Sequence, residues 1–104
     1  MPQLAHHVFF TLRDKSDAAA DGMIAACNRY LDGHDGVVHF AVGRRNPELV
    51  REVNDQEFDV SLHVVFRDRA AHDAYQVHPR HLEFIEEQRA NWAQARIFDS
   101  DLCE

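Results

Sequence analysis

The sequence has few cysteines, few glycines and no excess of positive charge. Only Cys27 and Cys103 are present among 104 residues, and their wide separation predicts reduced thiols rather than a disulfide or a cysteine metal site. The four glycines form no phosphate-binding loop, so we expect no nucleotide cofactor. Because 18 acidic residues face 11 basic ones, the formal net charge of −7 argues against nucleic acid and anionic membranes as partners.

Long hydrophobic runs are missing as well. No apolar segment approaches the length of a membrane span, and the opening Met1-Pro2-Gln3 lacks the charged-then-apolar pattern of a leader. We therefore expect a cytoplasmic protein. A chain of 104 residues with 45% hydrophobic residues predicts one domain over residues 1–104, with its core over about residues 4–99.

Alternating apolar residues, many of them β-branched or aromatic, predict four strands. The expected strands cover residues 4–12, 37–44, 58–66 and, as a short last strand, 96–99. The polar segment 45–57 is predicted to be a connection with at most one helical turn, and residues 100–104 a tail.

Apolar residues at three-and-four spacing predict the helices. Ser16 or Asp17 is the expected cap of a first helix whose buried stripe is Met23, Ala26, Cys27, Tyr30 and Leu31. Asp68 is expected to cap a second helix that ends before His78, and Pro79 to begin a third. The third helix is predicted to carry Leu82, Ile85, Gln88 and Trp92 along one side.

This order of elements predicts an α+β fold. The most economical arrangement is a ferredoxin-like, four-stranded antiparallel sheet with its helices on one face. The other face is expected to expose apolar residues, namely Phe9, Val38 or Phe40, Val65 and Phe98. The same sheet of a second copy would cover them, which predicts a homodimer with a dimeric α+β barrel. His7, His39 and His63 are expected on this face, where their protonation would loosen association.

A proline break brings a phenol and two imidazoles together in the segment Ala74 to Phe84. Pro79 suits the first position of a helix, so His78 is expected at a helix N-terminus, with Tyr75 one turn before it and His81 one turn after it. The unperturbed pKa values of tyrosine and histidine, about 10 and about 6.5, straddle neutrality. Tyr75 and His81 are therefore a candidate acid–base pair. A purely structural hydrogen bond between them is an equally supported alternative. For His78, helix capping is the favoured interpretation.

Four stretches of the sequence together carry a resemblance to a known family. They are His6-x-Val8-x-Phe10-x-Leu12, Gly43-Arg44, Phe58-Asp59 before Leu62-x-Val64-x-Phe66, and Ala74-Tyr75-x-x-His78-Pro79-x-His81. In these the chain resembles the stress-responsive A/B barrel family, or Dabb domain, of the dimeric α+β barrel proteins. The resemblance covers residues 4–99 and implies a homodimer of ferredoxin-like subunits, but no single activity.

One plant member of that family is a polyketide cyclase that performs an intramolecular aldol condensation without a cofactor. The resemblance implies that its acid–base residues correspond to Tyr75 and His81, and its first-strand histidine to His6. Another of its pocket histidines, on the third strand, corresponds to Val60, so the same substrate is not implied. In the predicted chemistry, His81 takes a proton next to a carbonyl while Tyr75 donates to the developing oxyanion.

Three functional classes follow, and the sequence leaves open whether the chain is an enzyme. The first is a small-molecule pocket between sheet and helices, lined by Tyr75, His81, His6, Val8, Val60, His78, Phe84 and Ile85. The second is a non-catalytic stress or structural dimer, and the third a cofactor-independent, monooxygenase-like barrel. A zinc site of His6, His78 and His81 is a further alternative, but the motif contains no carboxylate or cysteine to complete it, so we expect neither metal nor cofactor.

Overall fold

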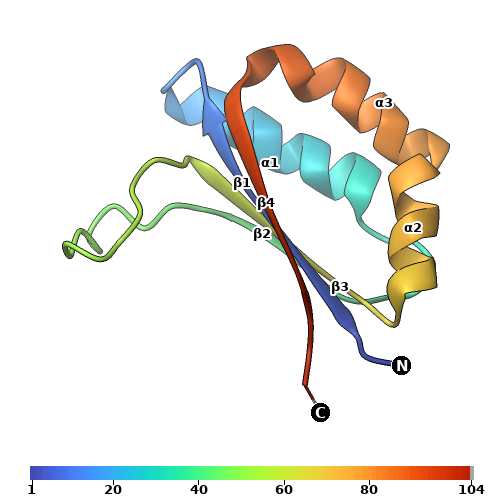
Figure 1. Ribbon diagram of the computed structural model, residues 1–104. Coiled ribbons are helices and arrows are strands. Elements are labelled where there is room, and N and C mark those ends of the chain that lie inside the picture. Colours follow the sequence, from blue (N-terminus) through green and yellow to red (C-terminus); the bar gives the residue numbers. More distant parts are fainter. Residues whose placement is uncertain (104) are drawn as a thin grey trace.

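The computed structural model describes residues 1–103 and contains four strands and three α-helices (Figure 1). The elements in chain order are β1 (Leu4–Leu12), α1 (Asp17–Leu31), β2 (Val37–Arg44), β3 (Val60–Phe66), α2 (Arg69–Val77), α3 (Pro79–Gln88), a 3₁₀ turn (Arg89–Asn91) and β4 (Trp92–Asp101). None of the helices in the described part is long and apolar enough to cross a membrane.

The four strands form one antiparallel sheet in the order β2-β3-β1-β4, so β1 and β3 are central and β2 and β4 are edges. The helices pack together on one face of this sheet (Figure 1). This arrangement confirms the predicted α+β, ferredoxin-like class.

Side-chain caps define where each helix begins. The Ser16 hydroxyl accepts a hydrogen bond of 3.1 Å from the Ala19 amide, and the Asp68 carboxylate accepts one of 2.9 Å from the Ala71 amide. His78 caps α3, because its Nδ1 accepts a hydrogen bond of 3.1 Å from the Arg80 amide. All three caps satisfy amides that have no partner within their helix. The sequence predicted the caps at residues 68 and 78, and the structure selects Ser16 from the predicted alternatives Ser16 and Asp17.

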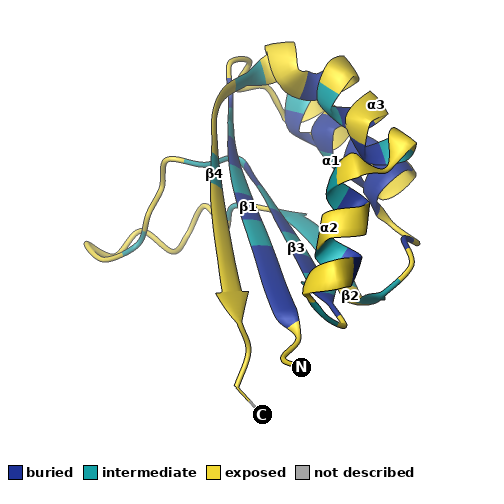
Figure 2. Cartoon of the chain, turned by 45° about the vertical axis from the view of Figure 1, so that its right-hand side comes forward, coloured by how far each residue is buried: buried dark blue, intermediate teal, exposed yellow. Residues whose placement is uncertain are grey.

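The core lies between the sheet and the helices, where the central strands are most deeply buried (Figure 2). Alternate residues of β1 and β3 point into it, including Val8, Phe10, Leu62 and Val64, each less than 5% exposed. Phe40 of β2 also packs against this core, so it does not belong to the opposite face, whereas its alternative Val38 is exposed.

The prediction for the end of α3 was wrong. The helix ends at Gln88, and Trp92 begins β4, where it pairs with Leu12 and packs against the Phe10 ring at 4.8 Å. The predicted stripe was also rotated: His81 and Phe84 face the core together with Gln88, while Leu82 is 54% exposed. The reason is that the proline corner fixes where the helix starts and hence which side faces inward, and large aromatic rings gain more from burial there.

The connection between β2 and β3 has no helix or strand from residue 45 to 59, and β3 starts at Val60 rather than at residue 58. The carboxylate of Asp59 accepts a hydrogen bond of 2.8 Å from the Leu12 amide, so a side chain replaces part of the sheet ladder there. An ion pair of 2.5 Å joins Asp55 to Arg96 on β4. The last strand extends to Asp101, so the predicted tail is shorter than expected, and Glu104 lies outside the described residues.

Candidate functional site

A pocket of about 100 Å³ lies between the sheet and the two C-terminal helices. Its lining residues are His6, Val8, Phe10, Leu31, Leu62, Tyr75, Gln76, His81, Phe84, Ile85, Trp92, Ala95 and Ile97. The inward-facing Ala95 and Ile97 of the edge strand β4 are exposed, so the pocket opens along β4. Two larger hollows flank the turn between β1 and α1. Charged and polar residues make up most of the lining of one and half of the lining of the other.

Six of the eight predicted pocket residues line this cavity together: His6, Val8, Tyr75, His81, Phe84 and Ile85. Val60 does not reach it, because this residue is completely buried in the core. His78 also lies outside the cavity: it is exposed, caps α3 and packs its ring 4.7 Å from that of His34. His78 is therefore not placed to complete the alternative zinc site of His6, His78 and His81 that the sequence suggested.

Tyr75 and His81 face one another across the start of α3, with ring centroids 4.6 Å apart. The Tyr75 hydroxyl and His81 Nδ1 are both buried, and within residues 1–103 neither has a hydrogen-bond partner. Burial raises the pKa of Tyr75, so its phenol is protonated at neutral pH. Burial lowers the pKa of His81 to about 4, an effect that the nearby Gln76 backbone partly opposes, so the imidazole is neutral.

The third polar group of the pocket, His6, is held by a partner from the neighbouring strand. Its Nδ1 lies 2.5 Å from the carboxylate of Asp99, which faces it across the β1–β4 pairing. Burial lowers the pKa of His6, and the hydrogen bond that His6 donates to the Asp99 carboxylate acts in the opposite direction. The contact fixes the ring orientation of a side chain that is only 4% exposed.

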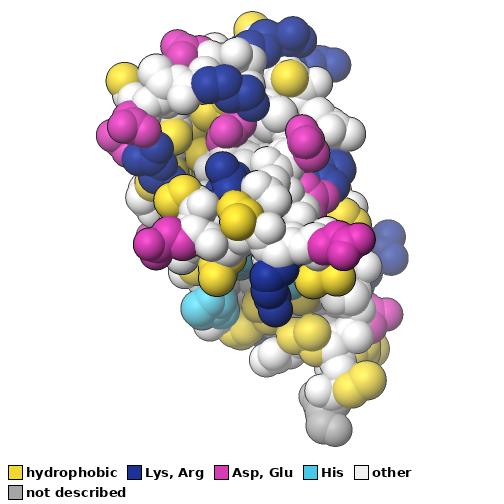
Figure 3. All heavy atoms as spheres, turned by 90° about the vertical axis from the view of Figure 1, so that its left-hand side faces the viewer, with side chains coloured by type: hydrophobic (Ala, Val, Ile, Leu, Met, Phe, Trp, Pro, Cys, Tyr) yellow, Lys and Arg dark blue, Asp and Glu magenta, His cyan; other side chains and the backbone are white. Residues whose placement is uncertain are grey.

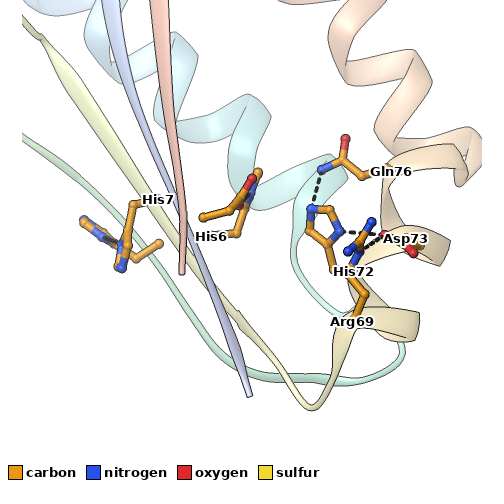
Figure 4. Close-up of polar contacts among 8 residues, drawn as sticks. His6, His7, Arg69, His72, Asp73 and Gln76 are labelled. Carbon is orange, nitrogen blue, oxygen red and sulfur yellow. Dashed lines mark hydrogen bonds and ion pairs between the residues drawn. The ribbon is translucent and has the colours of Figure 1, made fainter. Parts of the chain in front are cut away.

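Sequence reasoning missed three polar residues near the pocket: His72, Gln76 and Asp99. His72 lies three residues before Tyr75 in α2, so helical spacing would have placed both on one face. It extends from α2 toward His6, with Gln76 and Asp73 beside it (Figure 4). The sequence carries no comparable signal for Asp99, because its proximity to His6 depends on strand register.

The opposite face of the sheet holds a second pair of histidines. His7 projects away from His6 and the helices (Figure 4), and its Nδ1 lies 2.8 Å from Nδ1 of His63. The Phe9 ring lies 6.0 Å from that of His63 and 5.8 Å from that of Phe98. His7, His63, Phe9 and Phe98 thus form one patch, which no helix covers in the described part of the chain (Figure 1).

A family model described as "Stress responsive A/B Barrel Domain" matches residues 4–102. None of the curated proteins matches the sequence. Among solved structures, a Dabb family protein from Mesorhizobium loti has a TM-score of 0.81 and 21% identity, with 100% of both chains covered. The hydroxynitrile lyase of Passiflora edulis has a TM-score of 0.79 and 19% identity over 99% of this chain and 95% of that chain.

A third similar structure is a mutant of SnoaB, a cofactor-independent oxygenase from Streptomyces nogalater. Its TM-score is 0.74 and its identity 14%, over 100% of this chain and 96% of that chain. Other structures with the same fold are described as dimeric ferredoxin-like proteins. At these identities the likeness shows the fold alone.

Proposed function

Because the chain belongs to the stress responsive A/B barrel domain family, we propose that it is a homodimer whose pocket binds a small carbonyl compound and moves a proton on it. One observation carries this proposal: the Tyr75 hydroxyl and His81 Nδ1 are buried beside the same cavity without a partner in the described part of the chain. A buried polar atom without a hydrogen bond costs stability, so a bound ligand that supplies both bonds explains why the pair is there.

Each group is in the protonation state that the step requires. The neutral imidazole of His81 offers a lone pair to a hydrogen on the carbon next to the carbonyl, and Tyr75 offers its O–H to the carbonyl oxygen. As the C–H bond breaks, the proton passes to Nδ1 and the electron pair moves into an enolate, whose oxygen the phenol stabilises. His6, held by Asp99, lies on the same pocket wall and is available to orient the substrate.

The low pKa of His81 narrows the substrate class. An imidazole with a pKa of about 4 is a weak base, so it requires a carbon acid that is already activated. A hydrogen between two carbonyls, as in β-dicarbonyl compounds, meets that requirement. Because the cavity measures about 100 Å³, well below the volume that holds a drug-sized ligand, only the reacting end fits inside and the rest extends along the open edge at β4.

The test compares the wild type with Tyr75→Phe in a thermal-shift assay with β-dicarbonyl ligands such as triacetic acid lactone. We expect the ligand to raise the melting temperature of the wild type but not of the variant. The ligand-free variant should be at least as stable as the wild type, because the lost hydroxyl is buried without a partner within residues 1–103. Tyr30→Phe is the matched control, since that hydroxyl bonds to Glu87 outside the pocket and its loss should not affect the ligand shift.

Other results of these assays would favour one of the two alternative functions. If no carbonyl ligand shifts the wild type and Tyr75→Phe melts several degrees lower, the tyrosine is structural and the chain is a non-catalytic dimer. A cofactor-independent oxygenase is the other alternative, supported by the shared fold of the Streptomyces enzyme. Oxygen consumption with a quinol substrate would favour it over the proton-transfer function.

The homodimer is supported by the uncovered face of the sheet. Phe98 and Val38 on this side are each 52% exposed, and Phe9 and Val65 are half-buried. On the side drawn in Figure 3, acidic and basic side chains are mixed over the upper part, while hydrophobic side chains gather below. We expect light scattering to give a molar mass twice that of one chain for the wild type. For Phe98→Asp we expect the mass of a single chain. Val53→Asp, in the exposed connection, is the control that should remain dimeric.

A further inference from the structure

We propose that His6, His72 and Asp99 bind one divalent transition-metal ion, with Zn²⁺ as the best match. One candidate ligand atom from each residue lies within 4.8 Å of those from the other two. The three side chains come from β1, α2 and β4, so the fold brings them together from distant parts of the chain. This inference goes beyond the proton-transfer function and does not rest on it.

The two imidazoles already have the separation that a shared metal needs. Zn–N bonds of about 2.0–2.1 Å and a tetrahedral angle place the centres of two ligating rings about 5 Å apart. The rings of His6 and His72 are 5.4 Å apart and inclined by 64°, which leaves their edges free to converge. Two imidazoles and one carboxylate, with a fourth position for water, are a ligand set that Zn²⁺ accepts.

The surroundings of His72 orient its ring for this role. Its Nδ1 lies 3.0 Å from the Asp73 carboxylate, which also forms an ion pair of 2.9 Å with Arg69 (Figure 4). A carboxylate on one ring nitrogen assigns the proton to that nitrogen and leaves the lone pair on Nε2. The contact between His72 Nε2 and the Gln76 side-chain amide is long, at 3.4 Å, so a metal that binds to Nε2 breaks only a weak hydrogen bond.

His6 and Asp99 require one adjustment. Their atoms are 2.5 Å apart, a distance that a bridging proton allows, whereas two ligands of one Zn²⁺ stand about 3.3 Å apart. The His6 side chain is only 4% exposed and fixed by its packing, but that of Asp99 is 43% exposed on the edge strand. The carboxylate therefore moves outward when the metal replaces the proton, while the two imidazoles stay in place.

The experiment titrates untagged protein with Co²⁺, followed by visible absorption, and with Zn²⁺, followed by calorimetry. We expect one ion per chain, and at least about a tenfold loss of affinity in both His72→Ala and Asp99→Asn. Neither substitution removes a fully buried side chain, so both variants should fold; circular dichroism checks this. His63→Ala is the matched control: it removes a histidine of the opposite face and should leave the affinity unchanged.

Two results would overturn the metal site. The first is the absence of binding at micromolar protein, and the second is binding that His63→Ala abolishes while His72→Ala does not. No carbonyl ligand is present in these titrations, so their outcome is separate from that of the Tyr75→Phe test. A chain that binds the metal but no carbonyl compound would retain this site and lose the proposed proton transfer.

Discussion

Gly36 and Ala71 are in such close contact that a Cβ atom added to Gly36 would lie 2.4 Å from the Ala71 Cβ. Gly36 precedes β2 with a φ of +82°, and its carbonyl accepts a hydrogen bond of 2.7 Å from the Arg67 amide. The glycine therefore serves two purposes: it adopts a backbone conformation that other residues avoid, and it lets α2 approach the sheet.

We predict that Gly36→Ala lowers the free energy of unfolding by about 2–4 kcal/mol, because steric overlap adds to the cost of positive φ. Gly33→Ala is the matched control, since Gly33 has a φ of +79° but no atom within 4 Å of its added Cβ. It should lose only about 1 kcal/mol. Urea unfolding of the three proteins measures both effects, and equal losses in the two variants would contradict the role of the Ala71 contact.

A second prediction concerns stability in mild acid. Burial lowers the pKa of His81 from 6.5 to about 4, and the imidazoles of His6, His34 and His72 add to this effect. The unfolded chain therefore binds more protons than the folded one between these two pH values, so stability falls as the pH drops from 6.5 to 4. The shift sets an upper limit of about 3 kcal/mol on this contribution.

His81→Phe keeps a ring of similar size but cannot be protonated. We expect its free energy of unfolding to depend less steeply on pH between 6.5 and 4 than that of the wild type, as measured by urea unfolding at several pH values. Asp35→Asn, at an exposed position in the turn before β2, is the control and should follow the wild type. A wild-type slope that persists in His81→Phe would assign the acid sensitivity to other groups.

The two cysteines should differ sharply in reactivity. Cys27 of α1 is 0% exposed, and burial raises the pKa of its thiol to about 12, while Cys103 is exposed. Because the thiolate is the reactive form, we expect an aromatic disulfide reagent to modify one thiol per native chain and two in denaturant. In Cys103→Ser the native count should fall to zero. Rapid modification of Cys27 in that variant would mean that the core between α1 and the sheet opens readily.

The strands β1 and β2 were predictable because the alternation of their side chains is typical of a strand and not of a helix. Alternating, mostly β-branched and aromatic residues gave the bounds of β1 and β2 correctly, and the caps at Ser16, Asp68 and His78 gave the helix starts. Trp92 was assigned wrongly because a large apolar residue four positions after Gln88 suits a helix as well as a strand. Pairing with Leu12 decides between them, and pairing is a long-range property.

The candidate pocket was predictable where its residues are close in sequence, and not where they are far apart. The proline corner brought Tyr75 and His81 together within a few residues, so local geometry was sufficient to place them in one pocket. Asp99 and His6 are 93 positions apart, and a shift of one residue in strand register would turn the carboxylate to the other face. For that reason neither the partner of His6 nor the candidate metal set could be derived from the sequence alone.

The last prediction concerns Asp59, which joins the connection after β2 to the end of β1. Its carboxylate accepts hydrogen bonds of 2.8 Å from the Leu12 amide and from the Lys15 ammonium group. Burial by itself would raise the pKa of Asp59, but the hydrogen bonds from Lys15 and Leu12 outweigh it, so the pKa lies below its usual value. The resulting stability is present above the unfolded pKa of about 3.9 and disappears as the pH falls through the lower folded value.

We therefore expect Asp59→Asn to lower the free energy of unfolding by about 1 kcal/mol at pH 7, because an amide replaces a charged acceptor at the Leu12 and Lys15 contacts. The difference from the wild type should shrink as the pH falls below the unfolded pKa of about 3.9 and through the lower folded value. Asp35→Asn, at an exposed position in the turn before β2, is the control and should be neutral at both pH values. A loss in Asp59→Asn that is the same at neutral and acid pH would mean that the shape of the side chain, and not its charge, secures this end of the sheet.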